Sequence, residues 1–203
     1  MHRFSYSAGS YTPRVTDRNA YLGTDPTSTV DRILLSTLVY ATPSTAFPPL
    51  QRFTEYPRYS KYVEWVRQDG DGGAGTAYDL HFSWWKLRYT ARSEVIEIDA
   101  PNRLAWRVCK DIDAHGEWRI EPEPSSAPPD RETASRIYFE ATYDPHSADE
   151  DAISLPRLIS LDWLVRKVRP RALAEAESVV CELVEAIEGE PRDVELTVHE
   201  APG

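Results

Sequence analysis

The sequence predicts an α+β fold in which an antiparallel sheet packs against one long helix near the C-terminus. Residues 155–189 repeat apolar side chains at steps of three and four, the spacing of a helix with one apolar face. Most of residues 30–144 are instead rich in alternating β-branched and aromatic side chains, which favours strands. Short loops separate these strands, so consecutive strands are expected to be antiparallel neighbours.

The first predicted strand spans residues 29–41, and the prolines within residues 43–63 then allow only two short helices. In the strand predicted at 87–98 the apolar alternation changes between Val95 and Ile96, which indicates a β-bulge. After the short helices, six more strands are expected at residues 61–68, 76–83, 87–98, 103–110, 116–120 and 132–143. With the first strand they make a sheet of seven strands, and the long helix covers one of its faces. The tail at residues 192–199 either adds a strand or remains coil.

The predicted helix at 155–189 needs a large partner surface. At 1.5 Å per residue it would be roughly 50 Å long, and it would not be stable alone in water. Gly189 and Pro191 end it. Pro170 lies inside it, where proline costs about 3 kcal/mol. Either the helix kinks at Pro170, or a first helix ends near Arg169 and a second begins with Pro170.

The length of 203 residues fits one domain with appended ends. Residues 1–28 are polar and without period, which predicts an N-terminal arm. Residues 29–189 form the predicted domain, and residues 190–203 form a C-terminal tail. The chain contains no run of 18 apolar residues and its start has no apolar segment of the signal-peptide kind, so a cytoplasmic protein without membrane insertion is expected.

Charge narrows the class of partner. The net charge of −10, from 33 acidic and 23 basic residues, argues against a nucleic-acid partner. Lysine occurs only at positions 61, 86, 110 and 167, and this acid-rich, lysine-poor composition suggests a salt-adapted, halophilic source. Cys109 and Cys181 are expected to be reduced, buried thiols, with a disulfide as the alternative.

Motifs for metal or cofactor chemistry are weak. Asp111, Asp113 and His115 fall in a predicted turn, so they do not make a convincing metal site. The Asp- and Gly-rich loop 69–75 is similar to the start of a calcium-binding loop. Further along the chain, however, Leu80 occupies the position where such a loop needs a bidentate glutamate. The sequence contains no nucleophile elbow, phosphate loop or dinucleotide fingerprint. We therefore predict no catalytic residue, no metal and no cofactor.

Four local segments, together with the order of the predicted elements, carry a resemblance to a known family. They are ATPSTAF at 41–47, YPRY at 56–59, VIEIDAPNRLAW at 95–106 and GEWRI at 116–120. With these segments the chain resembles the Bet v 1-like or START-like (SRPBCC) superfamily, in its polyketide cyclase/dehydrase or coenzyme-Q-binding-like branch, over about residues 29–189. The resemblance implies a helix-grip fold, in which a curved seven-stranded sheet wraps around the long helix and leaves a cavity for an apolar ligand. It supplies no shared catalytic motif.

Aromatic side chains on predicted inward faces or near the helix are the main candidate ligand-binding residues, because together they make a bulky apolar lining. Trp84 and Trp85 are set apart, since they fall at a hairpin tip and could flank a cavity mouth, touch a membrane or join two subunits in a homodimer. The candidate ligand-binding residues are Tyr78, Leu80, Phe82, Trp106, Trp118, Phe139, Tyr143 and Trp163.

Three functions remain open from the sequence. The first is a carrier or sensor of a hydrophobic small molecule such as a lipid, isoprenoid, quinone or polyketide-like compound. The second is a polyketide cyclase/aromatase-type enzyme, which needs an ionisable group inside the cavity. Glu117, Glu140, Arg107 and His81 are the candidates for that group, with His81 expected on the outer face. The third is an interaction module with a filled core, which predicts no cavity.

Overall fold

A computed structural model describes residues 30–84, 87–147 and 161–201, with the backbone alone described at residues 84, 87 and 161–174. The predicted arm at 1–28 and the start of the predicted long helix, 155–160, lie outside the described residues. The elements are β1 (Asp31–Val39), α1 (Pro43–Gln51), η1 (Phe53–Arg58), β2 (Val63–Asp69), β3 (Ala77–Trp84), β4 (Leu87–Asp99), β5 (Arg103–Val108), β6 (Ala114–Pro122), η2 (Pro124–Ser126), β7 (Ser135–Tyr143), η3 (Pro145–Ser147), α2 (Leu161–Glu188) and β8 (Leu196–Glu200).

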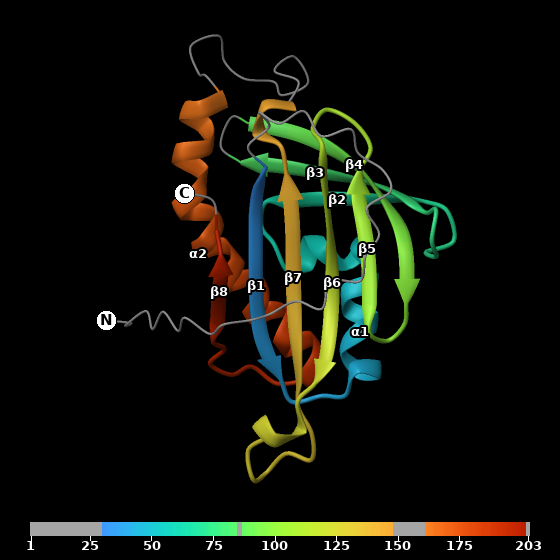
Figure 1. The fold of residues 1–203 in the computed structure, drawn as a ribbon, viewed down its shortest axis with the longest axis vertical. Coiled ribbons are helices and arrows are strands. Elements are labelled where there is room, and N and C mark those ends of the chain that lie inside the picture. The colour runs from blue at the N-terminus through green and yellow to red at the C-terminus, as the bar shows by residue number, and fades with distance from the viewer. Residues whose placement is uncertain (1–29, 85–86, 148–160, 202–203) are drawn as a thin grey trace.

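The strands form one antiparallel sheet with the order β2-β3-β4-β5-β6-β7-β1-β8 (Figure 1). The predicted number of seven strands was wrong, because the C-terminal tail adds an eighth strand that pairs with β1.

Arg192 holds the start of this tail in place. Its guanidinium donates hydrogen bonds to the carboxylate of Glu188 at 2.8 Å and to the backbone carbonyl of Leu38 at 2.7 Å.

Two short helices follow β1, as predicted. Thr42 caps α1, since its hydroxyl accepts the backbone N–H of Thr45 at 3.3 Å, and Pro43 occupies the first turn, where a missing N–H costs nothing. The second helix, η1, is of the 3₁₀ type. Phe47 and Leu50 of α1 and Phe53 of η1 are buried under the sheet.

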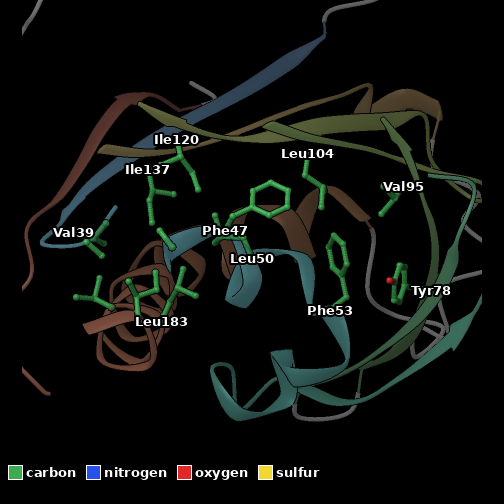
Figure 2. Packing of buried hydrophobic residues seen from close by; sticks show 14 of the residues in the cluster. Val39, Phe47, Leu50, Phe53, Tyr78, Val95, Leu104, Ile120, Ile137 and Leu183 are labelled. Carbon is green, nitrogen blue, oxygen red and sulfur yellow. The ribbon is translucent and has the colours of Figure 1, made fainter. Parts of the chain in front are cut away.

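The hydrophobic core lies on the concave side of the curved sheet (Figure 2). Leu104 and Ile120 of the sheet point toward Phe47 of α1 (Figure 2), and the rings of Phe53 of η1 and Tyr78 of β3 are tilted, with centroids 4.8 Å apart. Leu104 is completely buried. The short helices therefore fill one part of the space that the sheet encloses.

The bulge predicted in the strand at 87–98 is confirmed. The pairing of β4 with β5 shifts register between Val95 and Glu97. As a result Val95 stays in the core, with 1% of its surface exposed, whereas Ile96 is 46% exposed. A bulge of this kind bends the strand and increases its twist, which helps the sheet to curve around the helices.

α2 is a single helix from Leu161 to Glu188, so the predicted alternative of two helices divided near Pro170 is not found. Gly189 ends the helix, as predicted: this glycine has a positive φ of 80°, the left-handed conformation typical of a helix end, and its N–H donates to the carbonyl of Glu185 at 2.8 Å. Cys109 and Cys181 are free thiols as predicted, but both are exposed rather than buried. Among the described helices, none combines the length and the apolar character needed to cross a membrane.

Candidate ligand-binding cavity

A cavity of about 570 Å³ remains between the sheet, α2 and the segment that joins η1 to β2. This volume lies within the range of small-molecule sites, about 300–1,000 Å³. An interaction module with a filled core would have no such cavity, so the structure does not favour that alternative. The described lining residues are Leu35, Ser36, Thr37, Tyr56, Ser60, Tyr62, Val63, Phe82, Trp118, Ile137, Phe139, Glu175, Ala176, Val179, Val180, Leu183 and Leu196.

The sheet side of the cavity is built by the inward positions of neighbouring strands. In β7 the alternation of side chains turns Ile137 and Phe139 to the same face. The register places Leu35 of β1 beside Phe139, and Trp118 of β6 on its other side. The rings of Trp118 and Phe139 are tilted, with centroids 4.7 Å apart, so they form one continuous aromatic wall.

The helical side of the cavity comes from one face of α2. Ala176, Val179, Val180 and Leu183 line the cavity, and their steps of three and four place them on the same side of the helix. Ala176, Val179 and Leu183 belong to the repeat of apolar side chains within residues 155–189 that predicted the helix and that forms the apolar stripe of α2. This stripe lines the cavity and also packs against the core, to which Leu183 belongs.

Tyr56 contributes a hydroxyl group that is already used by the protein. Its O–H donates to the backbone carbonyl of Leu50 at 2.8 Å. Burial is the main cause that raises the pKa of Tyr56 far above its ordinary value, so this hydroxyl stays neutral and remains a donor. Tyr56 therefore offers a cavity ligand its ring rather than a titratable group.

Ser36 and Thr37 bring polar atoms of β1 close to the cavity, and both are engaged with the C-terminal tail. The hydroxyl of Thr37 donates to the carbonyl of Glu195 at 3.0 Å. Ser36 Oγ lies 2.8 Å from His199 Nε2. Burial, followed by the positive charge of Arg136, lowers the pKa of His199, so the imidazole is held neutral.

The ionisable groups that an enzyme was expected to place in the cavity lie elsewhere. His81 stacks on the exposed ring of Trp65 with centroids 4.9 Å apart, on the face away from the core-facing Leu80. Glu117 pairs with Arg103 at 2.6 Å, and Glu140 with Arg32 at 2.9 Å. The fourth candidate, Arg107, pairs with Glu94 at 2.7 Å. These four groups therefore form ion pairs or stack on a neighbouring ring, and none of them is among the described residues that line the cavity.

The predicted ligand-binding residues divide into groups. Phe82, Trp118 and Phe139 line the cavity. Tyr78 and Leu80 also face inward, but they are buried in the core.

Trp106 is not among the described lining residues; its ring centroid lies 6.2 Å from that of Phe139, and its indole packs against Gly116. Tyr143, at the end of β7, is not among the described residues of the lining. The side chains of Trp163 and Trp84, and the whole of Trp85, lie outside the described part of the structure.

Glu175 is the lining residue whose importance the sequence did not reveal. Its side chain is 11% exposed, and its two carboxylate oxygens contact Lys61 and Ser60. A signal was present, because Glu175 lies three residues after Ala172 and four before Val179, within the apolar stripe of the helix. Leu196 could not be found in this way, because its place depends on the tail joining the sheet.

A family model described as polyketide cyclase / dehydrase and lipid transport matches residues 32–175. A search of curated proteins found no match. Among solved structures, the fold is similar to that of TTHA0849 from Thermus thermophilus, with 18% identity, a TM-score of 0.54 and coverage of 78% of this chain and 97% of the other.

The fold is also similar to that of the di-domain ARO/CYC StfQ from the steffimycin biosynthetic pathway. The identity is 14% and the TM-score 0.53, with coverage of 79% of this chain and 51% of StfQ, so the present chain spans about half of that protein. At these identities the two structures establish the similarity of the fold alone.

Proposed function

Since the chain belongs to the polyketide cyclase / dehydrase and lipid transport family, we propose that it binds a hydrophobic small molecule in the cavity between sheet and α2, as a carrier or sensor. A lipid, isoprenoid, quinone or polyketide-like compound has the required apolar surface. Cytoplasmic location, the absence of a nucleic-acid partner and a homodimer contact stay predictions from the sequence.

The chemistry of the lining is the observation that carries this proposal. Aromatic and aliphatic side chains from β1, β3, β6, β7 and α2 surround the cavity. Burying apolar ligand surface against such a wall contributes about 25 cal/mol per Å² of buried surface to the free energy of binding. Phe82, Trp118 and Phe139 are proposed as direct ligand contacts, and Trp106 as the neighbouring ring that holds Phe139 in position.

A polyketide cyclase/aromatase-type reaction is the second candidate. It is favoured by the family and by the one carboxylate in the described lining, that of Glu175. A carrier is preferred because a cyclase needs acid-base groups that converge on the substrate. The residues predicted for that purpose, Glu117, Glu140, Arg107 and His81, are engaged outside the lining.

Native mass spectrometry of protein purified from its own host tests the proposal. We expect an additional mass in the native spectrum that disappears on denaturation. Binding of the apolar dye N-phenyl-1-naphthylamine to ligand-free protein provides a second readout. Val179→Trp places an indole in the cavity and should weaken dye binding at least tenfold, whereas Ser178→Trp, at the exposed neighbouring position of α2, should leave it unchanged.

Circular dichroism confirms that both variants remain folded. Absence of any bound mass together with absence of dye binding would reject the proposal. Equal loss of dye binding in Val179→Trp and Ser178→Trp would mean that the dye binds outside this cavity.

A further inference from the structure

Glu175 places a carboxylate in an otherwise largely apolar lining. It begins the described part of the cavity-facing side of α2, one residue before Ala176. Oε2 of Glu175 lies 2.9 Å from Nζ of Lys61, and Ser60 Oγ donates to its Oε1 at 3.2 Å. Lys61 itself is 67% exposed, so this corner marks the place where the cavity approaches solvent.

The other hydroxyl groups around the cavity are largely satisfied by the protein. Those of Tyr56 and Thr37 donate to backbone carbonyls, and Ser36 is paired with His199. Ser60 donates to Glu175. Among the described lining residues, hydrogen-bonding capacity toward a ligand is therefore concentrated at one end of the cavity, where Glu175 lies and where Tyr62 also lines the wall.

The carboxylate of Glu175 has acceptor capacity left. An ionised carboxylate offers about four lone-pair sites and no donor. Ser60 and Lys61 use one site on each oxygen. The remaining sites can accept a hydrogen bond from a ligand, and hydrogen bonds to an ionised group are stronger than those between neutral groups.

The same carboxylate selects against anions. A ligand that carried its own carboxylate would bring two negative charges together in a partly buried site, where like charges repel more strongly than in water. The nearby ammonium of Lys61 is already paired with Glu175 and is mostly in solvent. The polar end of the cavity thus fits a neutral hydrogen-bond donor.

We propose that the ligand is an apolar molecule with a neutral hydroxyl head, an alcohol or a phenol, and that Glu175 accepts the hydrogen bond from this head. The inference rests on the proposed function and specifies its ligand class. The apolar body lies along Phe139 and Val179, and the head lies at the corner formed by Ser60 and Glu175. Free fatty acids, which carry a negative charge at neutral pH, should bind more weakly than such a neutral ligand.

Displacement of N-phenyl-1-naphthylamine by two matched probes, 1-decanol and decanoate, tests this selectivity. The probes share their chain length and differ only in the head group. At about pH 8 decanoate is ionised, and wild-type protein should bind 1-decanol at least tenfold more tightly. In Glu175→Gln, whose amide oxygen can still accept from Ser60, the two affinities should come within about threefold, mainly through tighter binding of decanoate.

Glu177→Gln is the matched control, because it removes one negative charge from an exposed position of the same helix and should leave the wild-type preference intact. Binding of both probes with equal affinity to wild type would overturn the inference and leave the proposed function standing. The inference is equally overturned if Glu175→Gln retains the tenfold preference, since Glu175 would then only attach α2 to Lys61 and Ser60. Failure of the dye and of both probes to bind would instead overturn the proposed function.

Discussion

Replacing Arg192 with alanine should lower the free energy of unfolding by about 3 kcal/mol. Arg192 donates from Nε and Nη2 to the two carboxylate oxygens of Glu188, both at 2.8 Å, and from Nη2 to the Leu38 carbonyl at 2.7 Å. Its guanidinium also lies 4.2 Å from the ring centroid of Tyr40. These contacts join the end of α2, the start of the tail and β1.

The size of the loss follows from the burial of Glu188. Its side chain is 0% exposed, and without Arg192 its carboxylate would keep the backbone N–H of Tyr40, at 2.8 Å, as a hydrogen-bond donor. Removing one partner of a buried ion pair costs about 3–5 kcal/mol. We expect the lower end of this range, because Arg192 is 21% exposed and water can partly replace it.

The stability difference between wild type and Arg192→Ala should depend on pH in a definite direction. Burial alone would raise the pKa of Glu188, but the hydrogen bonds from Arg192 and from the Tyr40 N–H outweigh it and lower the pKa below the ordinary 4.5. The stability contributed by the pair is therefore fully present above pH 4.5 and is lost as the pH falls through the lower folded pKa. The difference between wild type and Arg192→Ala should accordingly shrink below pH 4.5.

Urea denaturation followed by circular dichroism measures these changes. Arg58→Ala is the matched control, because the ion pair of Arg58 with Glu55 is on the surface and its loss should have little effect. In a Glu188→Gln background, Arg192→Ala should cost clearly less, since no buried charge is left behind. A loss below about 0.5 kcal/mol at neutral pH, or an equal loss in both backgrounds, would refute the reasoning.

Further predictions concern the site and the tail. Gly116→Ala should destabilise the fold by at least about 1–3 kcal/mol in urea denaturation, because its new Cβ would lie 2.2 Å from the Glu140 carbonyl oxygen and 2.5 Å from the Trp106 ring; wild-type stability would show that the strands separate easily. Trp106→Ala should weaken retention of the bound molecule in native mass spectrometry, because Phe139 loses its neighbouring ring, and unchanged retention would show that Phe139 holds its position without Trp106. The depressed pKa of His199 means that the stability it contributes is present above its ordinary 6.5 and is lost as the pH falls below it. Acidification from about pH 7.5 to about pH 5.5 should therefore lower the melting temperature, and His199→Gln should reduce this fall; an identical fall in the variant would exclude His199 as its source.

The fold was largely predictable because its signals are local. Alternation in β7 turned Ile137 and Phe139 inward, and the change of alternation at Val95 marked a bulge that the pairing of β4 with β5 confirms. The arrangement of an antiparallel sheet with few helices also agrees with the structure. The local pattern does not decide strand β8, because Leu196–Glu200 joins the sheet through contacts with residues more than 150 positions earlier in the chain.

The candidate site was predicted only in part. Tyr78 and Phe82 share one face of β3, and the pattern treats them alike. Phe53 from η1 covers Tyr78, whereas Phe82 remains at the cavity. Glu175 was missed for the opposite reason, since an acid on a helix is ordinarily assigned to solvent, and its contacts with Ser60 and Lys61 cross from α2 to a distant loop.

Periodicity and turn residues in the chain were enough to establish strands, bulge, long helix and the inward faces, because backbone geometry translates spacing directly into direction. The position of the hollow required the folded chain. Inward-facing side chains become core or cavity wall according to where α1, α2 and β8 come to lie, and that placement depends on the packing of the whole molecule rather than on any segment within it.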